Sequence, residues 1–433
     1  MKSLFDKINA KLNAQGGFLK AVSVLVSGTV FAQGVVVLSL PILTRLYSPS
    51  EFSIFAVYTS LLGILTVVSC LRFEIAIPIS QDDKEAVALV FLALISNTVI
   101  SILISFVIWF FSTEILLFFN KEAFAKLIWL IPIGTFVSGV YIAFQYWATR
   151  KRKFTVIAKT RMVQSVSGVS IQVVMGMAGF SVIGLILGQI VKVSAGLYQL
   201  VVGFWQDANK YLKEIKFEYL KITFRKYDQF PKYSTLEALA NSAGIQLPVI
   251  LIAALSIGSE AGYLMLAMQV MMIPMQFIGN AVSQVYLGHA SEKYKIGELA
   301  QYTKQCIFQL LKIGIIPLTL ISVLAPVIFP YVFGTEWKRA GDMVLWMLPW
   351  FIMQLLVSPI SMSLSVIGKQ RIGLIIQIFG LVIRVGGLVL ISIYSVNYMF
   401  EYYVISGFVF YSLYLYAVLL ILRKLRVNNC IGL

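Results

Sequence analysis

The sequence predicts an all-α integral membrane protein with about twelve transmembrane helices in two six-helix lobes around a central cavity. Three observations support this prediction: the composition, the number of long apolar runs, and the placement of the basic residues. The chain has 433 residues, of which 59% are hydrophobic and only 12% are charged, and its mean hydropathy is +0.87. A soluble protein averages roughly 25% charged residues. The shortage of charge therefore indicates that most of the chain lies in a bilayer.

The apolar runs can be counted along the chain, because a bilayer-spanning helix needs about 20 mostly apolar residues. The first half contains such runs at 20–43, 53–71, 86–111, 125–148, 161–180 and 182–204. The second half contains them at 236–256, 261–287, 306–332, 342–367, 372–394 and 400–422. Only the tight turn Gly179-Phe180-Ser181 separates the fifth run from the sixth. An even number of spans places both termini on the same side of the membrane.

The basic residues indicate which side that is. The chain has 35 Lys and Arg against 19 Asp and Glu, a net charge of +16. With a cytoplasmic N-terminus, 27 of the 35 basic residues fall in cytoplasmic segments, 5 fall on the opposite side and 3 fall within spans. Such a bias is the positive-inside signal. Both termini are therefore predicted to be cytoplasmic, and topology explains the positive charge without nucleic-acid binding.

A basic segment near the middle of the chain divides the spans into two sets of six. We predict an N-terminal lobe over 1–205, a basic cytoplasmic linker with an amphipathic helix over 206–234, and a C-terminal lobe over 235–433. Within the linker, apolar residues recur at helical spacing between lysines and arginines, namely Leu212, Ile215, Tyr219 and Ile222. This pattern is typical of an interfacial helix on anionic lipids, and a solvated basic linker is the alternative.

Two cations lie near the middle of apolar runs: Lys192 in the sixth and Arg384 in the eleventh. A charge at mid-bilayer costs about 2.5–3.5 kcal/mol on insertion scales, so ionisable residues there usually face a water-filled interior. We predict that each lobe contributes one of these cations to a shared cavity for an anionic group. Pairing with backbone carbonyls or another side chain is the structural alternative. Arginine suits a phosphate because its planar fork donates two parallel hydrogen bonds.

Three further charged residues lie at the ends of spans. Arg72 and Glu74 follow the second span, and because they are two residues apart they cannot share one helical face. Each is expected to have a partner on another helix, or one of them faces the cavity. Arg45 follows the first span, where it is either an interface anchor beside Tyr47 or another cavity cation.

A polar strip is predicted at the start of the seventh span. Glu237 is followed by Asn241, four residues on and therefore on the same helical face, and then by Gln246. This strip, together with Glu74, is a candidate for proton or sodium coupling or for a polar part of the cavity.

Tyrosines cluster in the last span, at Tyr402-Tyr403 and at Tyr411, Tyr414 and Tyr416. Because tyrosine is enriched at membrane–water interfaces, this pattern predicts mostly lipid- or interface-facing packing.

Several classes of function are excluded. The chain has no P-loop and no other glycine-rich phosphate cradle, so it carries no ATPase cassette. Its single histidine, His289, and three scattered cysteines indicate no metal site and no disulfide framework. No extramembrane loop gathers the acids or histidines that a transferase or polymerase would need. We therefore predict movement of a molecule across the membrane, not enzymatic catalysis.

Three stretches carry a resemblance to a known family. They are Ser27-Gly28-Thr29 through Leu40-Pro41-Ile42-Leu43-Thr44-Arg45-Leu46-Tyr47-Ser48-Pro49-Ser50-Glu51-Phe52, then Leu71-Arg72-Phe73-Glu74-Ile75-Ala76-Ile77-Pro78, and Arg150-Lys151-Arg152-Lys153-Phe154 followed by Arg161 and Gln164-Ser165. Together they resemble the O-antigen and oligosaccharide repeat-unit flippases of the multidrug/oligosaccharidyl-lipid/polysaccharide exporter superfamily. The motifs lie in the first 165 residues, and the span count extends the resemblance to the whole chain.

The resemblance implies two six-helix lobes with a central cationic cavity in the bacterial inner membrane. It implies a substrate of oligosaccharide repeat units on undecaprenyl pyrophosphate, flipped to the periplasmic leaflet for O-antigen, capsule or exopolysaccharide synthesis. It implies no cofactor, an ion gradient as the energy source, and a polysaccharide polymerase and chain-length proteins as partners. Twelve spans differ from the fourteen typical of lipid II flippases, which counts against lipid II as substrate. The alternatives are a cation-coupled multidrug exporter of the same superfamily and a membrane glycan polymerase.

Overall fold

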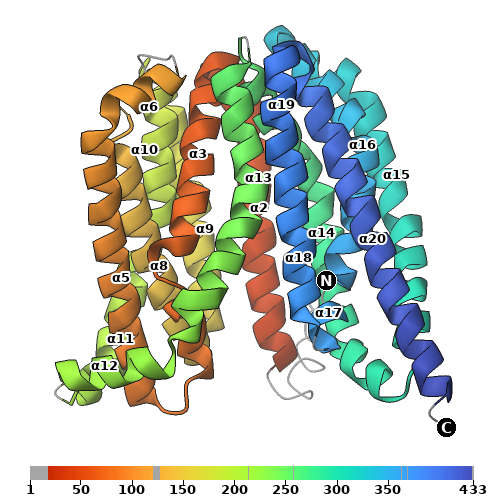
Figure 1. Ribbon diagram of the computed structural model, residues 1–433. Coiled ribbons are helices and arrows are strands. Elements are labelled where there is room, and N and C mark those ends of the chain that lie inside the picture. Colours follow the sequence, from red (N-terminus) through yellow and green to blue (C-terminus); the bar gives the residue numbers. More distant parts are fainter. Residues whose placement is uncertain are drawn as a thin grey trace, which may run out of the picture. The chain divides into compact units, whose positions relative to one another are not determined.

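The computed structural model describes residues 18–119, 127–212, 214–256, 258–361, 363–367 and 369–431. These residues form helices joined by short turns, with no β-strand among them (Figure 1). The predicted all-α fold class is therefore confirmed. Contacts divide the described residues into two compact units. Unit 1 comprises the residues through Tyr47 and Leu61–Leu239, and unit 2 comprises Ser48–Ser60 and the residues from Ala240 onward.

Unit 1 contains most of the helices of the first half of the chain. They are α2 (Phe18–Leu46), the second part of α3 (Pro49–Ser69), the short α4 (Phe73–Ala76) and η1 (Ile77–Ile79), α5 (Asp83–Phe110), α6 (Ser112–Phe119), α8 (Leu130–Arg150), α9 (Phe154–Met177), α10 (Ser181–Ser194), α11 (Leu197–Leu212), α12 (Phe217–Lys226) and η2 (Phe230–Ser234). The chain leaves this unit in the first turns of α13 (Thr235–Leu255).

Unit 2 contains the remainder. Besides most of α13 and the start of α3, it has α14 (Glu260–Lys295), α15 (Leu299–Phe333), η3 (Thr335–Trp337), α16 (Lys338–Ile360), α17 (Ser363–Val366), α18 (Gln370–Leu381), η4 (Val382–Gly386), α19 (Gly387–Tyr394), η5 (Val396–Tyr398) and α20 (Met399–Ile431). The lobe and linker boundaries that we placed from the sequence remain predictions.

Eleven helical segments of the described chain are long and apolar enough to cross a membrane. The chain is therefore a multi-pass membrane protein. The helix α9, which corresponds to the predicted fifth span, is not among the eleven, because Lys159, Arg161, Gln164 and Gln172 make it more polar. The predicted number of about twelve spans thus stays a prediction, as does the cytoplasmic position of the termini.

Close helix packing in unit 1 depends on small residues around one tyrosine. The Tyr47 hydroxyl is buried and donates a hydrogen bond of 2.7 Å to the Gln172 carbonyl on α9. A Cβ added at Gly184 of α10 would lie 2.3 Å from that hydroxyl, so only glycine fits there. Small residues at such positions let membrane helices approach closely. This packing fixes α10, which carries one of the predicted site residues, against α2 and α9.

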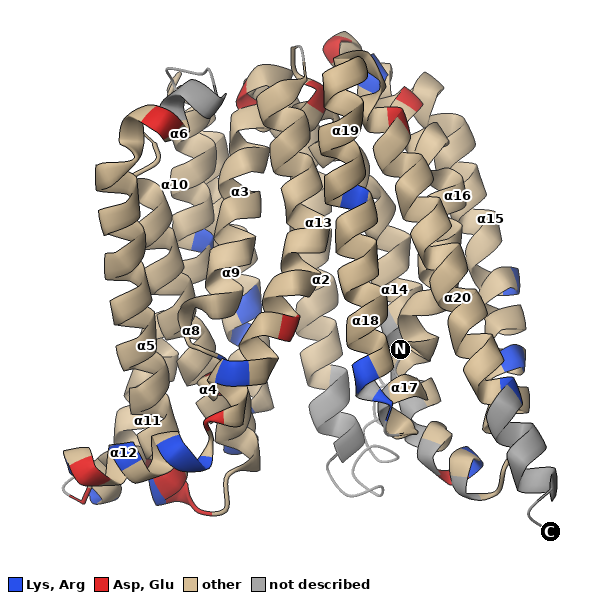
Figure 2. Cartoon of the chain, in the orientation of Figure 1, with Lys and Arg blue, Asp and Glu red and all other residues tan. Residues whose placement is uncertain are grey.

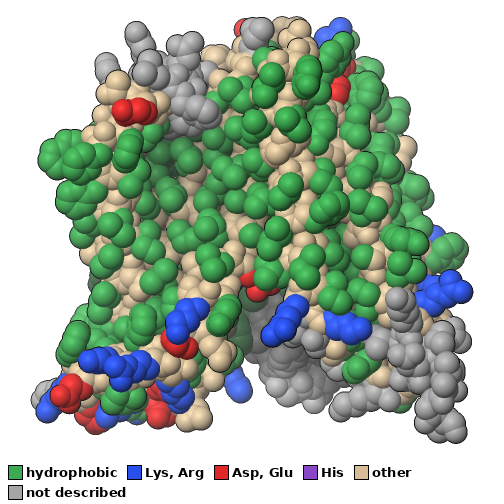
Figure 3. Space-filling model, in the orientation of Figure 1, with side chains coloured by type: hydrophobic (Ala, Val, Ile, Leu, Met, Phe, Trp, Pro, Cys, Tyr) green, Lys and Arg blue, Asp and Glu red, His purple; other side chains and the backbone are tan. Residues whose placement is uncertain are grey.

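Charge and apolar surface are separated within each unit. Lys and Arg gather mostly at one end of the helices, and few lie along their middle (Figure 2). Hydrophobic side chains cover the helices between their ends on the face shown (Figure 3). A surface of this kind is stable in a bilayer, where exposed apolar side chains contact lipid tails instead of water.

Candidate functional site: two embedded cations

Lys192 lies in the last turn of α10, a helix of only 14 residues. The helix ends at Ser194, and Gly196 adopts a left-handed conformation with a φ of +79° before α11 begins. Lys192 is thus beside a break in the span, and not in the middle of one continuous helix. The free carbonyls at a helix C-terminus favour a cation by about 0.3–1 kcal/mol. That gain is smaller than the cost of about 2.5–3.5 kcal/mol for a cation at mid-bilayer.

The stem of Lys192 packs across α9. A Cβ added at Gly168 would lie 2.6 Å from the Lys192 Cβ, so glycine makes room for this lysine. The side chain is partly buried. It has no ion pair with any acid in the part of the chain that the structure describes. Its charge is therefore available to a ligand.

Arg384 lies in η4, a five-residue π-helical segment between α18 and α19. It is 4% exposed, and its Nη1 donates one long hydrogen bond of 3.4 Å to the Gly244 carbonyl on α13. The guanidinium lies 4.3 Å from the centre of the Phe410 ring and 5.2 Å from that of Tyr411. Its Nε and Nη2 have no hydrogen-bond partner within the described residues. Single π-helical turns inside α-helices occur frequently at functional sites.

Two other buried donors of unit 2 lack an acceptor among the described residues. The Tyr403 side chain is fully buried, its hydroxyl has no partner among the described residues, and it is within electrostatic range of Arg384. The Tyr403 ring packs edge-on against Trp350, with 4.9 Å between ring centres, and the Trp350 Nε1 has no hydrogen-bond partner in the described part of the chain. Buried polar groups are nearly always hydrogen-bonded, so several orphaned donors together indicate a place for an acceptor.

The surroundings of Arg384 correct one sequence prediction. We expected the tyrosines of the last span to face lipid or the interface. Instead Tyr403 and Tyr414 are buried, and Tyr411 lies beneath the guanidinium, whereas Tyr416 is 63% exposed as expected. For Tyr411 the physical reason is that its ring face contacts a desolvated cation, and such a contact contributes about 2 kcal/mol. Tyr403 and Tyr414 are buried because they pack against the rings of Trp350 and Phe410. The sequence offered no signal that would have joined Trp350 to these tyrosines.

Arg72 and Glu74 pair with each other, which corrects the expectation of separate partners. Arg72 Nη1 lies 3.5 Å from Glu74 Oε1. The expectation assumed a continuous helix, but α3 ends at Ser69, and Leu71 and Arg72 adopt φ values of 48° and 62°. This left-handed turn rotates Arg72 toward Glu74, which starts the next helix. Burial raises the pKa of Glu74, although its backbone hydrogen bond and the nearby Arg72 oppose that shift.

The remaining predicted residues lie at the surface. Arg45 is exposed in the last turn of α2. Glu237 and Asn241 are exposed one turn apart on α13, and Gln246 further along the helix is half-buried. The four have no hydrogen bond or ion pair among the described residues. The roles predicted for all eight site residues remain predictions.

The described residues hold no group of three or more histidines, cysteines or acids placed to bind a metal ion. The arrangement instead offers positive charge and hydrogen-bond donors inside apolar surroundings, Lys192 within unit 1 and Arg384 within unit 2. Chemically, each position is suited to an anion. Cations in apolar spans and interruptions of the spanning helices are features found at the substrate sites of secondary transporters.

Comparison with known proteins gives the family. The chain belongs to the polysaccharide biosynthesis protein family, which matches residues 42–342. No curated protein sequence matches it. This confirms the resemblance noted from the motifs.

Solved structures share the fold over nearly the whole chain. A lipid II flippase, MurJ, in an inward closed conformation is similar with a TM-score of 0.71 and 13% identity, covering 94% of this chain and 90% of its own. An inward-facing multidrug resistance MATE family transporter of the MOP superfamily has a TM-score of 0.62 and 17% identity, covering 92% and 95%. A mutant of the Vibrio cholerae MATE transporter VcmN has a TM-score of 0.61 and 12% identity, covering 94% and 97%. At these identities the likeness shows the fold.

Proposed function

We propose that the chain is a flippase that moves undecaprenyl-pyrophosphate-linked oligosaccharide repeat units across the bacterial inner membrane by alternating access. The observation that carries this proposal is the buried Arg384 guanidinium, which has two nitrogens without a hydrogen-bond partner and no ion pair with an acid among the described residues. A pyrophosphate supplies the acceptor oxygens and the negative charge that this group lacks. Membership of the polysaccharide biosynthesis protein family supports a glycan carrier as the molecule moved.

In this proposal the cations offset the cost of moving an anionic headgroup out of water. A charge in a low-dielectric interior is stabilised only when it is paired and hydrogen-bonded. Lys192 in unit 1 and Arg384 in unit 2 are the positive groups, and the Tyr403 hydroxyl is a neutral donor within electrostatic range of Arg384. The lipid tail stays in the bilayer while the headgroup moves.

Access to Arg384 requires movement, because the side chain is 4% exposed. The segment that carries it is the π-helical η4, flanked by α18 and α19. A local change at η4 that lifts the guanidinium from the Phe410 ring would expose Nε and Nη2 to a headgroup. Rocking of repeats in related transporter architectures is the general way in which such access alternates.

The test is the surface polysaccharide of a deletion strain that expresses variants of the chain. Arg384→Ala and Lys192→Ala are each expected to abolish or strongly reduce surface polysaccharide at wild-type protein levels. Arg384→Lys keeps the charge but loses the planar fork, so it should retain part of the function. Wild-type polysaccharide in both alanine variants would overturn the assignment of the site.

Two alternatives are distinguished by other measurements. A cation-coupled multidrug exporter has a structural basis, since MATE transporters share the fold. It predicts that overproduction raises drug resistance and that deletion leaves surface polysaccharide intact. A membrane glycan polymerase predicts that deletion strains accumulate flipped but unpolymerised repeat units. The flippase proposal predicts accumulation of unflipped units on the cytoplasmic side instead.

A further inference from the structure

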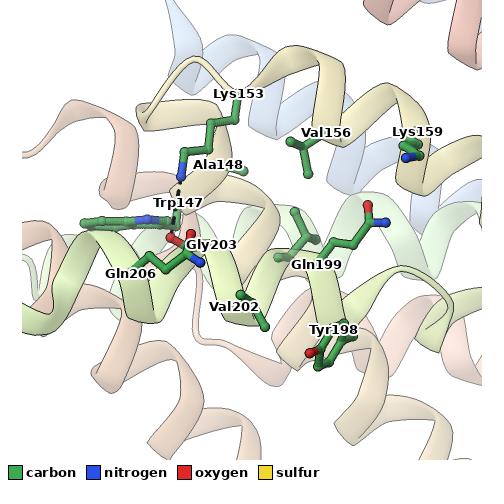
Figure 4. A pocket seen from close by; sticks show the side chains of 11 residues that line it. Trp147, Ala148, Lys153, Val156, Lys159, Tyr198, Gln199, Val202, Gly203 and Gln206 are labelled. Atoms are coloured by element: carbon green, nitrogen blue, oxygen red, sulfur yellow. Dashed lines mark hydrogen bonds between the residues drawn. The ribbon is translucent and has the colours of Figure 1, made fainter.

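A pocket of about 460 Å³ lies within unit 1 between α9 and α11, beside the end of α8 (Figure 4). None of the eight residues predicted above for the transport site lines it. Figure 4 shows Lys153, just before α9, and Val156 and Lys159 on α9 along one side. Tyr198, Val202 and Gln206 of α11 lie along the other. The pocket thus has a charged side and a mixed polar and apolar side.

The two lysines of this pocket differ in their partners. Lys153 Nζ lies 2.7 Å from Asp207 Oδ2, and the Trp147 Nε1 donates to the same oxygen at 3.3 Å. The charge of Lys153 is thereby compensated. Lys159 is exposed and has no ion pair or hydrogen bond to any described residue. Six residues along a helix correspond to roughly 9 Å. The pocket therefore carries a compensated charge at one end and a free cation about 9 Å along α9.

The residues around the pocket are of the kinds found at a membrane–water boundary. Its charged end adjoins the turn between α8 and α9, where Lys151, Arg152 and Lys153 follow one another. The positive-inside count predicts that this turn lies on the cytoplasmic side. On α11, Tyr198 is 80% exposed and Trp205 is 50% exposed, within a segment apolar enough to span the membrane. Exposed aromatic residues near lysines are typical of the headgroup level of a bilayer.

We propose that this pocket binds the headgroup phosphate of an anionic phospholipid of the adjacent leaflet, with Lys159 as the residue that holds the phosphate. The acyl chains would lie over the exposed faces of Tyr198, Val202 and Trp205. The amides of Gln199 and Gln206, which also line the pocket, are available to the glycerol or headgroup hydroxyls. The volume suits a headgroup with its glycerol, but not an oligosaccharide of several sugars. The site is independent of the proposed transport substrate.

The experiment measures phospholipid binding to the purified full-length protein by native mass spectrometry. Phosphatidylglycerol is compared with phosphatidylcholine as the neutral-headgroup control. Lys159→Gln is expected to weaken phosphatidylglycerol binding about fivefold, which corresponds to about 1 kcal/mol for one lysine near a phosphate. Phosphatidylcholine binding should not change. Lys304→Gln, which removes one exposed cation from α15, is the matched control and should leave both affinities unchanged.

A second variant tests the pocket itself, because charge alone could act at a distance. Val202→Trp fills the space between α9 and α11 and should lower phosphatidylglycerol binding without changing net charge. Equal binding of the two lipids by the wild type, or equal losses in Lys159→Gln and Lys304→Gln, would overturn the proposal. Displacement of phosphatidylglycerol by a polyprenyl pyrophosphate, with the same dependence on Lys159, would show that the pocket serves the flipped lipid instead.

Discussion

Units 1 and 2 each hold one embedded cation, but they accommodate it by different means. Unit 1 breaks a helix: Lys192 lies in the last turn of α10, partly buried, and Gly196 turns the chain immediately afterwards. Unit 2 keeps its helix and widens it: Arg384 lies in a π-helical segment, 4% exposed, over the Phe410 and Tyr411 rings. The first solution leaves the charge near a helix end, and the second encloses it.

Of the two cations, Arg384 is stabilised less by its surroundings and so has the greater need of a ligand. A cation–π contact contributes about 2 kcal/mol when desolvated, and a hydrogen bond to a charged group about 1.5–3 kcal/mol. Against these gains, each orphaned nitrogen of Arg384 costs about 1–3 kcal/mol. Lys192 remains partly exposed, and the free carbonyls at the end of α10 stabilise its charge. The net free-energy cost of placing Lys192 is therefore smaller. Arg384 therefore lowers the stability of the folded chain more than Lys192 does.

The largest effect is expected from neutralising the two cations in turn. Arg384→Met should raise the unfolding free energy by about 1–3 kcal/mol, because replacing an uncompensated buried charge with an apolar side chain is often stabilising. Lys192→Met should change it much less. Both variants should lose transport. Thermal unfolding in detergent, read beside surface polysaccharide, measures the two quantities separately. A loss of stability in Arg384→Met would contradict the comparison, since it would make Arg384 a structural residue.

The sequence was sufficient for the fold class, and it also singled out the two charged side chains, whose role stays a prediction. Apolar runs, charge counts and motifs depend on local composition, so α2 and α5 correspond closely to predicted spans. The break at Gly196 and the turn at Leu71 and Arg72 were not predicted, because both depend on backbone angles that neighbouring helices impose.

The partners of Arg384 could not be predicted for a related reason. Phe410 and Tyr411 lie on α20, and Gly244 lies on α13, both distant in sequence from η4. Only tertiary packing brings them to the guanidinium. The tyrosines could be recognised as a group from the sequence, but whether they face lipid or a buried cation depends on how α20 is rotated about its axis.

The second prediction concerns the two glycines that accompany these different solutions. Gly196→Ala should destabilise the protein by about 1–2 kcal/mol, because φ is +79° there, with a further cost because the new Cβ would lie 2.8 Å from the Thr160 side chain. Gly386→Ala in η4 is the matched control. It meets nothing within 4 Å and its φ is −60°, so it should be neutral or stabilising by about 0.5–1 kcal/mol. Similar losses of stability in both variants would mean that both segments need a glycine, and would contradict the difference between the two units.

The smallest effect concerns Glu74, a buried acid of unit 1 that pairs with Arg72 at the break after α3. Burial raises the pKa of Glu74 above its usual range. The folded chain therefore keeps this proton at pH values where the unfolded chain, with a glutamate pKa of about 4.3, has lost it. Stability from this group is complete below the unfolded pKa and is lost as the pH rises through the folded pKa.

Glu74→Gln should remove that part of the pH dependence, because glutamine imitates the protonated acid at every pH. The thermal midpoint of the wild type, measured upward from about pH 4, should fall relative to that of Glu74→Gln as the pH rises. Glu237→Gln removes an exposed carboxyl from α13 and should leave the wild-type slope in place. A wild-type midpoint that rises relative to Glu74→Gln over this window would mean that pairing with Arg72 outweighs burial. Unit 1 would then hold a permanent ion pair at the break after α3, and Glu74 would be no candidate for proton coupling.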